Sequence, residues 1–110
     1  MWGRVERRGV GIILSKRETL YLVSYDISSD KKRRKIANEM ENYGRRVQYS
    51  VFECRLTRAR LRQLYGKLLP LCTGATDSIR IYSLCESCAE KVTIIGNPGP
   101  PQEDEDVIIV

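Results

Sequence analysis

Hydrophobic and polar positions recur along the chain with periods that predict strands and helices. Residues 19–27 read TLYLVSYDI, which is rich in β-branched and aromatic residues and apolar on both alternating faces at its centre. That pattern is typical of a strand in the interior of a sheet. Ser28, Ser29 and Asp30 follow, and these residue types are good helix N-caps. Apolar residues then return at helical spacing until Gly44, so we expect a helix of about thirteen residues directly after the strand.

The second half of the chain predicts further elements of both kinds. Residues 47–56 (VQYSVFECRL) alternate and predict a strand with one partly polar face. Thr57 begins a second helix, with an apolar stripe from Leu61 to Leu69 that ends at Pro70 and Thr73-Gly74. Residues 77–84 and 91–96 predict two more strands, separated by CESCAE. Residues 97–106 read as a linker, and the terminal VIIV as a short strand that pairs with an existing sheet edge.

These elements indicate an α+β fold of the ferredoxin-like, split βαβ type. We expect the order strand, helix, strand, strand, helix, strand (βαββαβ), with an antiparallel sheet and both helices on one face. Residues 19–96 form this domain, residues 1–18 an N-terminal basic arm outside the core, and residues 97–110 a linker and tail strand. Because the first strand is apolar on both faces, we expect the free sheet face to pack on a second copy in a homodimer. A monomer with this face solvated is the alternative.

Length and composition narrow the possible classes of protein. The chain has 110 residues, 42% hydrophobic and 30% charged, which fits one small globular domain. Its longest apolar runs are far below the roughly 20 residues that cross a bilayer, so we expect no membrane segment, no signal peptide and a cytoplasmic location. The chain contains no histidine. Ser-His, Cys-His and other histidine acid–base chemistry are therefore excluded, which leaves carboxylates, metal-bound water, Tyr, Lys or Cys.

Positive charge is concentrated in one part of the chain. The net charge is +5, and residues 31–62 hold eleven bases against three acids: Lys31, Lys32, Arg33, Arg34, Lys35, Arg45, Arg46, Arg55, Arg58, Arg60 and Arg62. Residues 103–106 are all acidic. A basic body with an acidic tail suggests a polyanion partner, usually nucleic acid, held by phosphate contacts without base reading. A solvated basic surface is the alternative.

Asp26 is the first candidate for chemistry, because it ends a buried strand directly before a helix N-terminus. It could be a turn residue only. Magnesium usually takes one or two carboxylates, several waters and phosphate oxygens, so a second acid is needed. In a twofold dimer built about this sheet, Asp26 of the other copy can supply it. The bound metal would then replace the absent histidine base.

The four cysteines give a second candidate site. Cys85 and Cys88 form a single C-x-x-C, which is half of a zinc site, and without histidine the other ligands would be Cys54 and Cys72 or cysteines of a second chain. Zinc binding and redox chemistry are two interpretations. We favour the third, an ordinary turn with buried thiols.

Residues 21–56 (YLVSYDISSDKKRRKIANEMENYGRRVQYSVFECRL) resemble the CRISPR-associated protein family two, the small dimeric partner of the spacer-acquisition integrase. The most specific parts are YDI with the polar, basic stretch behind it, and QYSVFE about twenty residues later. The resemblance covers residues 19–96. Residues 1–18 precede the usual start, and the cysteine pair lies outside the family's pattern.

The resemblance implies site residues as well as a fold. It implies that Asp26 binds Mg²⁺ together with its symmetry mate, and that Tyr25, Arg33, Arg46 and Phe52 match positions linked to nuclease activity. Lys35 stands where some members have arginine, and it lacks that residue's planar fork. The residues expected to bind nucleic acid are Lys31, Lys32, Arg34, Lys35, Arg45 and Arg58. The terminal VIIV resembles a tail strand that crosses to the partner subunit.

The resemblance implies two roles in spacer acquisition. One is a metal-dependent endonuclease for single-stranded RNA or double-stranded DNA, in which water is the nucleophile and Arg33 and Arg46 stabilise phosphate charge. The other is a noncatalytic scaffold that binds DNA and the CRISPR-associated integrase (family one). A third interpretation, a VapD-like ribonuclease toxin, shares the fold and the charge.

Overall fold

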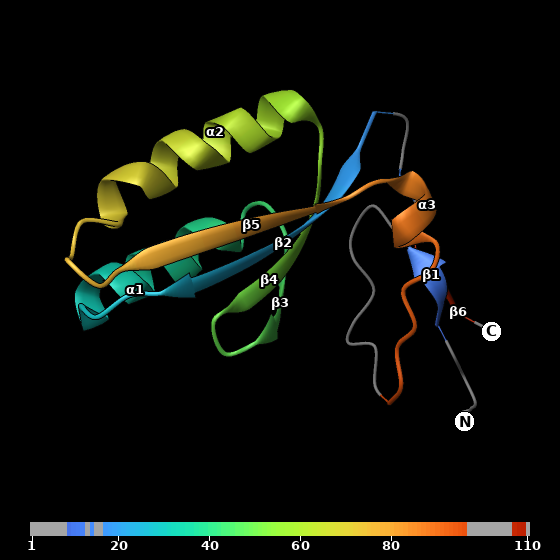
Figure 1. The fold of residues 1–110 in the computed structure, drawn as a ribbon, viewed down its shortest axis with the longest axis horizontal. Coiled ribbons are helices and arrows are strands. Elements are labelled where there is room, and N and C mark those ends of the chain that lie inside the picture. Colours follow the sequence, from blue (N-terminus) through green and yellow to red (C-terminus); the bar gives the residue numbers. More distant parts are fainter. Residues whose placement is uncertain (1–8, 13, 15–16, 97–106, 110) are drawn as a thin grey trace.

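The computed structural model describes residues 9–12, 14, 17–96 and 107–109 (Figure 1). Its centre is a four-stranded antiparallel sheet in the order β3-β4-β2-β5. These strands are β2 (Thr19–Asp26), β3 (Arg45–Gln48), β4 (Val51–Leu56) and β5 (Ser78–Leu84). Helix α1 (Asp30–Met40) joins β2 to β3, and helix α2 (Arg58–Leu68) with the short 3-10 helix η1 (Leu69–Leu71) joins β4 to β5. The predicted ferredoxin-like βαββαβ arrangement is therefore confirmed.

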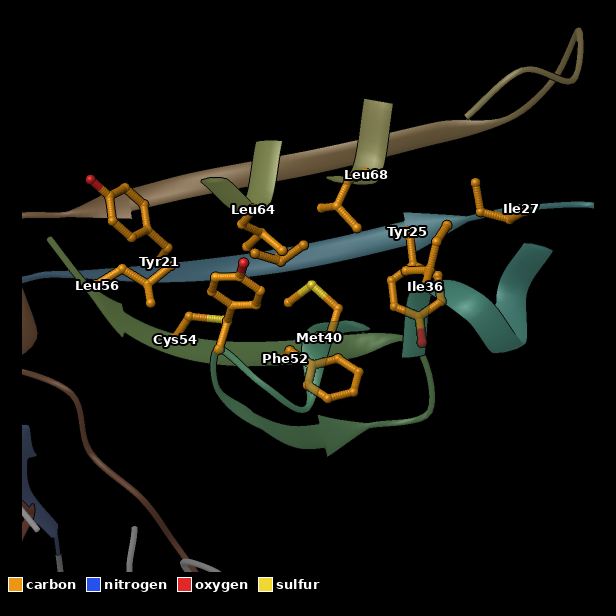
Figure 2. Packing of buried hydrophobic residues seen from close by; sticks show 12 residues of the cluster. Tyr21, Tyr25, Ile27, Ile36, Met40, Phe52, Cys54, Leu56, Leu64 and Leu68 are labelled. Carbon is orange, nitrogen blue, oxygen red and sulfur yellow. The ribbon is translucent and has the colours of Figure 1, made fainter. Parts of the chain in front are cut away.

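The hydrophobic core lies between the sheet and the two helices. Alternate residues of β2, Tyr21, Val23 and Tyr25, are buried on this side, as alternation in a strand requires. They meet side chains from β4, α1 and α2 in one cluster, which Figure 2 shows from close by. The intervening positions of β2, including Leu22 and Asp26, therefore point to the opposite face of the sheet.

Both helices begin at the residues that the sequence indicates. The Ser29 hydroxyl caps α1 by accepting from the Lys32 amide at 3.2 Å, and the Thr57 hydroxyl caps α2 by accepting from the Arg60 amide at 3.3 Å. Helix α1 ends at Met40, before the predicted stop at Gly44. Gly44 instead lies against β4. A Cβ at this position would be 2.1 Å from the Glu53 carbonyl oxygen, so only glycine allows such a close approach.

Two predictions about strands were wrong. Residues 47–56 do not form one strand, because the chain reverses at Tyr49 and Ser50 and makes the antiparallel pair β3 and β4. This pair supplies the two consecutive strands of the βαββαβ order, which the separate segments predicted above do not contain in that place. Residues 91–96 form no strand. After the short helix α3 (Glu86–Ala89), the amide of Val92 donates to the Ala89 carbonyl, and Val92 packs beside Leu20 in a second small apolar cluster. Packing rather than strand pairing therefore covers Val92, whereas Ile95 of the same segment is 94% exposed.

The two ends of the described chain meet in a second, two-stranded sheet. Strand β1 (Gly9–Ile12) pairs antiparallel with β6 (Val107–Ile109). The terminal strand was expected to pair with a partner subunit, whereas here it pairs with a strand of the same chain that the sequence did not predict. Leu14, from the expected N-terminal arm, packs against Leu20 and Ala89. The predicted linker at residues 97–106 lies outside the described residues, as do residues 1–8 of the arm. No helix in the described part of the chain is long and apolar enough to cross a membrane.

Candidate metal and nucleic-acid site

Asp26 is exposed at the end of the central strand β2. In the sheet register it lies opposite Ser78 of β5, on the face away from the helices. The chain then turns through residues 27–29 into the first turn of α1. The Asp26 carboxylate is therefore open to solvent, and the backbone that follows it leads within a few residues into the start of α1.

Arg33 holds the loop that follows Asp26. Its Nη1 donates to the Ile27 carbonyl oxygen at 2.8 Å, and its Nη2 pairs with the Asp30 carboxylate. The hydrogen bond to Asp30 is the main reason why the pKa of Arg33 is raised. The phenol of Tyr49, at the turn between β3 and β4, also faces this guanidinium and contributes to the same shift. Tyr49 is 77% exposed, and sequence reasoning did not assign it to this group.

Tyr25, Arg46 and Phe52 form a separate group on the helix side of the sheet. The rings of Tyr25 and Phe52 stack with centroids 6.4 Å apart, and both are buried. The Arg46 guanidinium lies 5.3 Å from the Phe52 centroid, and its Nη2 donates to the Tyr25 hydroxyl at 3.5 Å. The structure thus brings three of the predicted residues together but places Asp26 on the other face of the same strand.

Asp77, just before β5, also holds the loop of residues 27–29 that follows Asp26. The amide and hydroxyl of Ser28 donate to Asp77 Oδ1 at 2.9 and 3.1 Å, and the Gly74 amide donates to Oδ2 at 2.9 Å. The hydrogen bond from the Ser28 amide is the main reason why the pKa of Asp77 is lowered, followed by that from Gly74. Nearby, Lys32 Nζ bonds the Thr73 hydroxyl. Because the contacts of Ser28 and Lys32 join residues more than 40 positions apart, no local sequence signal could have revealed them.

The predicted basic band divides into exposed cations and cations held in contacts within the chain. Lys31, Arg34 and Lys35 are exposed on the side of α1 away from the buried Ile36 and Met40. Arg58 is exposed at the start of α2. The side chains of four other cations contact groups of the same chain: Lys32, Arg33, Arg46 and Arg60. Arg60 donates to the Asn42 carbonyl oxygen and lies over the Tyr43 ring.

Arg45 differs from the other residues expected to bind nucleic acid. Its Nη2 lies 3.9 Å from Glu53 Oε1, and the two side chains are only 16% and 17% exposed. Burial raises the pKa of Glu53, and the charge of Arg45 opposes this effect. Arg55 is also buried in β4. The clustering of bases in residues 31–62 therefore overstates the positive surface that a single chain presents.

Asp26 is the predicted site residue whose chemistry fits a magnesium ligand. Within the described part of the chain, no three Cys, Asp or Glu side chains gather around a common point that could hold a metal ion. Asp26 offers the hard oxygen ligands that magnesium prefers, and its exposure leaves room for waters and for a second carboxylate.

The cysteines differ from the favoured interpretation of a turn with buried thiols. Cys85 and Cys88 are both exposed, whereas Cys54 is buried in the core and Cys72 is half-buried. Burial raises the pKa of Cys54 to about 12. The prediction of buried thiols at residues 85–88 was therefore wrong, because α3 turns Ala89, and not its cysteines, towards Leu20.

The fold defines this chain as a ferredoxin-like protein with an exposed acid at the end of its central strand. The family model "CRISPR associated protein Cas2" matches residues 19–92. The chain is 50% identical over 91 residues to the CRISPR-associated endoribonuclease Cas2 1 of Chloroflexus aurantiacus, and the match covers 82% of this chain and 98% of that protein. The chain therefore belongs to the Cas2 family.

Solved structures agree with this assignment. The crystal structure of Streptococcus pyogenes Cas2 at pH 6.5 matches with a TM-score of 0.60 and 35% identity, and covers 70% of this chain and 99% of that one. A chain of a partial Cas6-RT-Cas1–Cas2 complex matches with a TM-score of 0.60 and 37% identity, and covers 73% of this chain and 88% of that one.

Proposed function

We propose that this protein acts in CRISPR adaptation as a homodimeric, Mg²⁺-dependent endonuclease that cleaves phosphodiester bonds in RNA or DNA. The observation that carries the proposal is the exposed carboxylate of Asp26 at the end of β2, in a chain of the Cas2 family. The endoribonuclease name of the Chloroflexus relative supports a nuclease. Magnesium would supply Lewis-acid chemistry, by neutralising phosphodiester charge and making a water molecule more acidic.

The residues predicted for the site have distinct roles in this proposal. Asp26 of each subunit would hold one side of the shared ion. Arg33 fixes the loop through the Ile27 carbonyl and offers positive charge to the phosphate. Tyr25 and Phe52 are buried, so they cannot stack on bases, and we assign them as positioning residues for Arg46.

A homodimer is needed because one chain brings one such carboxylate. The sheet face away from α1 and α2 is the surface on which two copies would meet, since Asp26 points to this face. Leu22 and Tyr82 lie directly opposite each other on it, and Tyr82 is 48% exposed. An exposed aromatic beside an aliphatic side chain on an open sheet face favours association.

The first test is cleavage by Asp26→Asn. Purified protein is incubated with labelled single-stranded RNA and duplex DNA, with and without Mg²⁺. We expect wild-type cleavage only with the metal, and a loss of at least about 100-fold in Asp26→Asn, because the substitution removes a charged ligand from both halves of the site.

The matched control is Glu41→Gln, which removes one exposed carboxylate outside this loop. It should cleave as the wild type does. If Asp26→Asn cleaves with magnesium at the rate of Glu41→Gln, the site assignment is wrong. Cleavage without any divalent ion by a metal-free preparation would contradict the magnesium dependence.

A second candidate function is a noncatalytic scaffold for the integrase. The match to a chain of a Cas1–Cas2-containing complex favours it, as do the exposed cations on α1, which can bind phosphates of a DNA duplex. The two functions differ at Asp26. If scaffolding is the biological role, Asp26→Asn should lose cleavage and still support integration of spacer DNA by the integrase.

A further inference from the structure

The C-x-x-C motif directly follows β5. It offers thiol chemistry that the proposed nuclease site does not use. Cys85 immediately precedes α3 and Cys88 lies within it. Residues three apart at the start of a helix have Cα atoms about 5 Å apart. A disulfide needs a Cα separation of roughly 4.4 to 6.8 Å, so the spacing of this pair lies within the range for one.

Both thiols are accessible to reagents in solution, which distinguishes them from the other two cysteines. Cys85 and Cys88 are exposed, while Cys54 is fully buried under α1 and α2 and Cys72 lines an apolar hollow with Leu68 and Ile79. The segment is also well anchored. Ala89 of α3 is fully buried against Leu20 of β2, so the pair is held at a fixed place beside the sheet.

We propose that Cys85 and Cys88 form a redox-active dithiol that exchanges with low-molecular-weight disulfides, closing and reopening an intramolecular disulfide. Cys85 is the attacking thiol. Its Sγ lies 3.2 Å from the Ser87 hydroxyl, which can donate to the thiolate. Cys88 is the resolving thiol, one helical turn away.

The acidities of the two thiols agree with this division. The pKa of Cys85 is lowered to about 7, first by the hydrogen bond with Ser87 and then by hydrogen bonds with Cys88. The pKa of Cys88 is raised, mainly by its hydrogen bond with Cys85. Near neutral pH, Cys85 therefore supplies the thiolate, which is the reactive form in thiol–disulfide exchange.

The exchange balances with a small disulfide, RSSR, as the oxidant. The Cys85 thiolate attacks one sulfur of RSSR, the S–S bond breaks, and the leaving thiolate takes up the proton that Cys85 has lost. Cys88 then loses its proton and attacks the Cys85 sulfur of the mixed disulfide, which releases the second RSH. The protein loses two hydrogens in total, and RSSR is reduced to two RSH. Excess RSH reverses both steps.

The test uses the full chain in glutathione buffers of graded ratio at pH 7, followed by alkylation of free thiols and intact mass measurement. The protein is unfolded for the alkylation, so that all four cysteines can react. We expect two free thiols in the oxidised wild type and four in the reduced wild type, with no glutathione retained and with the change reversible. Cys88→Ser should trap glutathione on Cys85, because no resolving thiol remains. Cys85→Ser should react at least about tenfold more slowly than the wild type.

Cys72→Ser is the matched control, and it should form the disulfide as the wild type does. Retention of the intramolecular disulfide in Cys85→Ser, or its loss in Cys72→Ser, would overturn the assignment. So would four free thiols in the wild type under excess glutathione disulfide, or protection of both thiols by zinc that a chelator removes. None of these readouts depends on nuclease activity.

A second measurement does not depend on any substitution. The Ala89 amide donates to the Cys85 carbonyl at 2.8 Å, and a disulfide would lock this turn. Hydrogen exchange at the Ala89 and Glu90 amides should slow at least about threefold on oxidation, while amides of α1 remain unchanged. Equal exchange in both redox states at these two amides would contradict a disulfide within α3.

Discussion

Single side chains in this protein show that a charged residue next to a candidate site is not always a ligand. Arg33 uses its guanidinium to hold the Ile27 carbonyl, and Asp77 uses its carboxylate to join Ser28 to Gly74. Both act on the short loop between β2 and α1. The position of Asp26 therefore depends on residues that would look like ordinary surface charges in a sequence.

Asp77 gives a prediction about pH. Because amide donors lower its pKa in the folded chain, folding favours the charged form, and this stabilisation is present above its ordinary pKa of 3.8. It is lost as the pH falls through the lower folded value. Asp77→Asn should melt below the wild type at pH 7, and the difference in melting temperature should shrink in acid.

The control for this pH series is again Glu41→Gln, whose side chain is exposed at the end of α1. Its melting temperature should follow the wild type across the same pH range. A difference between Asp77→Asn and the wild type that stays constant from neutral pH into strong acid would show that the carboxylate charge is not the cause.

At the scale of elements, Gly44 and Gly66 differ in how closely other atoms approach them. A Cβ at Gly44 would lie 2.1 Å from the Glu53 carbonyl oxygen, and this backbone atom cannot move aside. A Cβ at Gly66, in the exposed face of α2, meets nothing within 4 Å. Gly44→Ala should destabilise the protein by about 1–3 kcal/mol, and Gly66→Ala should stabilise it by about 0.5–1 kcal/mol.

Urea unfolding monitored by circular dichroism measures both changes, and each glycine serves as the control for the other. The opposite signs are the essential result. Equal and small effects would mean that the turn after α1 relaxes enough to accept a side chain, and that the close approach at Gly44 does not limit packing.

Local signals explain which elements could be predicted from the sequence. Ser29 and Thr57 act through their own hydrogen bonds, so the helix starts were predictable. The reversal at Tyr49 and Ser50 contains no Gly, Pro, Asn or Asp, so Ser50 was the only turn signal, and serine is a weak one. Residues 91–96 have a strand-like composition, but they pair with no strand in the described part of the chain, and Val92 packs in the cluster of Leu20 instead.

The candidate site shows the same division. Asp26 was identifiable because it ends a strongly patterned strand directly before a helix cap. The clamps by Asp77 and Thr73, and the approach of Tyr49 to Arg33, depend on the sheet order, which brings distant segments together. The ion pair between Arg45 and Glu53 also joins two neighbouring strands, so a count of charges along the chain cannot detect it.

At the scale of the whole molecule, the open face of the sheet predicts the oligomeric state. We expect sedimentation of the wild type at twice the chain mass. Tyr82→Glu places a charge on this face opposite Leu22, and should weaken dimerisation at least about tenfold and reduce magnesium-dependent cleavage in parallel.

Tyr65→Glu is the control, because Tyr65 is 57% exposed on α2, which covers the other side of the sheet. This variant should remain dimeric. A wild type that sediments as one chain at assay concentration would contradict both the dimer and the shared ion.

The distribution of charge over the molecule predicts how binding depends on salt. Replacing Lys31, Arg34 and Lys35 with alanine should weaken binding to duplex DNA and lower the slope of log affinity against log salt by about one for each lost phosphate contact. Fluorescence anisotropy at several salt concentrations measures the slope. Lys91→Ala, an exposed cation beyond α3, should leave it unchanged. An unaltered slope in the triple variant would identify the α1 surface as solvated charge only.

The central place of β2 has a consequence for synthesis on the ribosome. β2 is bonded on one side by β4 and on the other by β5, which follows only after both helices and two other strands. A nascent chain that has not yet released β5 exposes one edge of its central strand. Productive folding thus waits until β5 has left the ribosome, and products that stall or end before β5 should be the species that require chaperones.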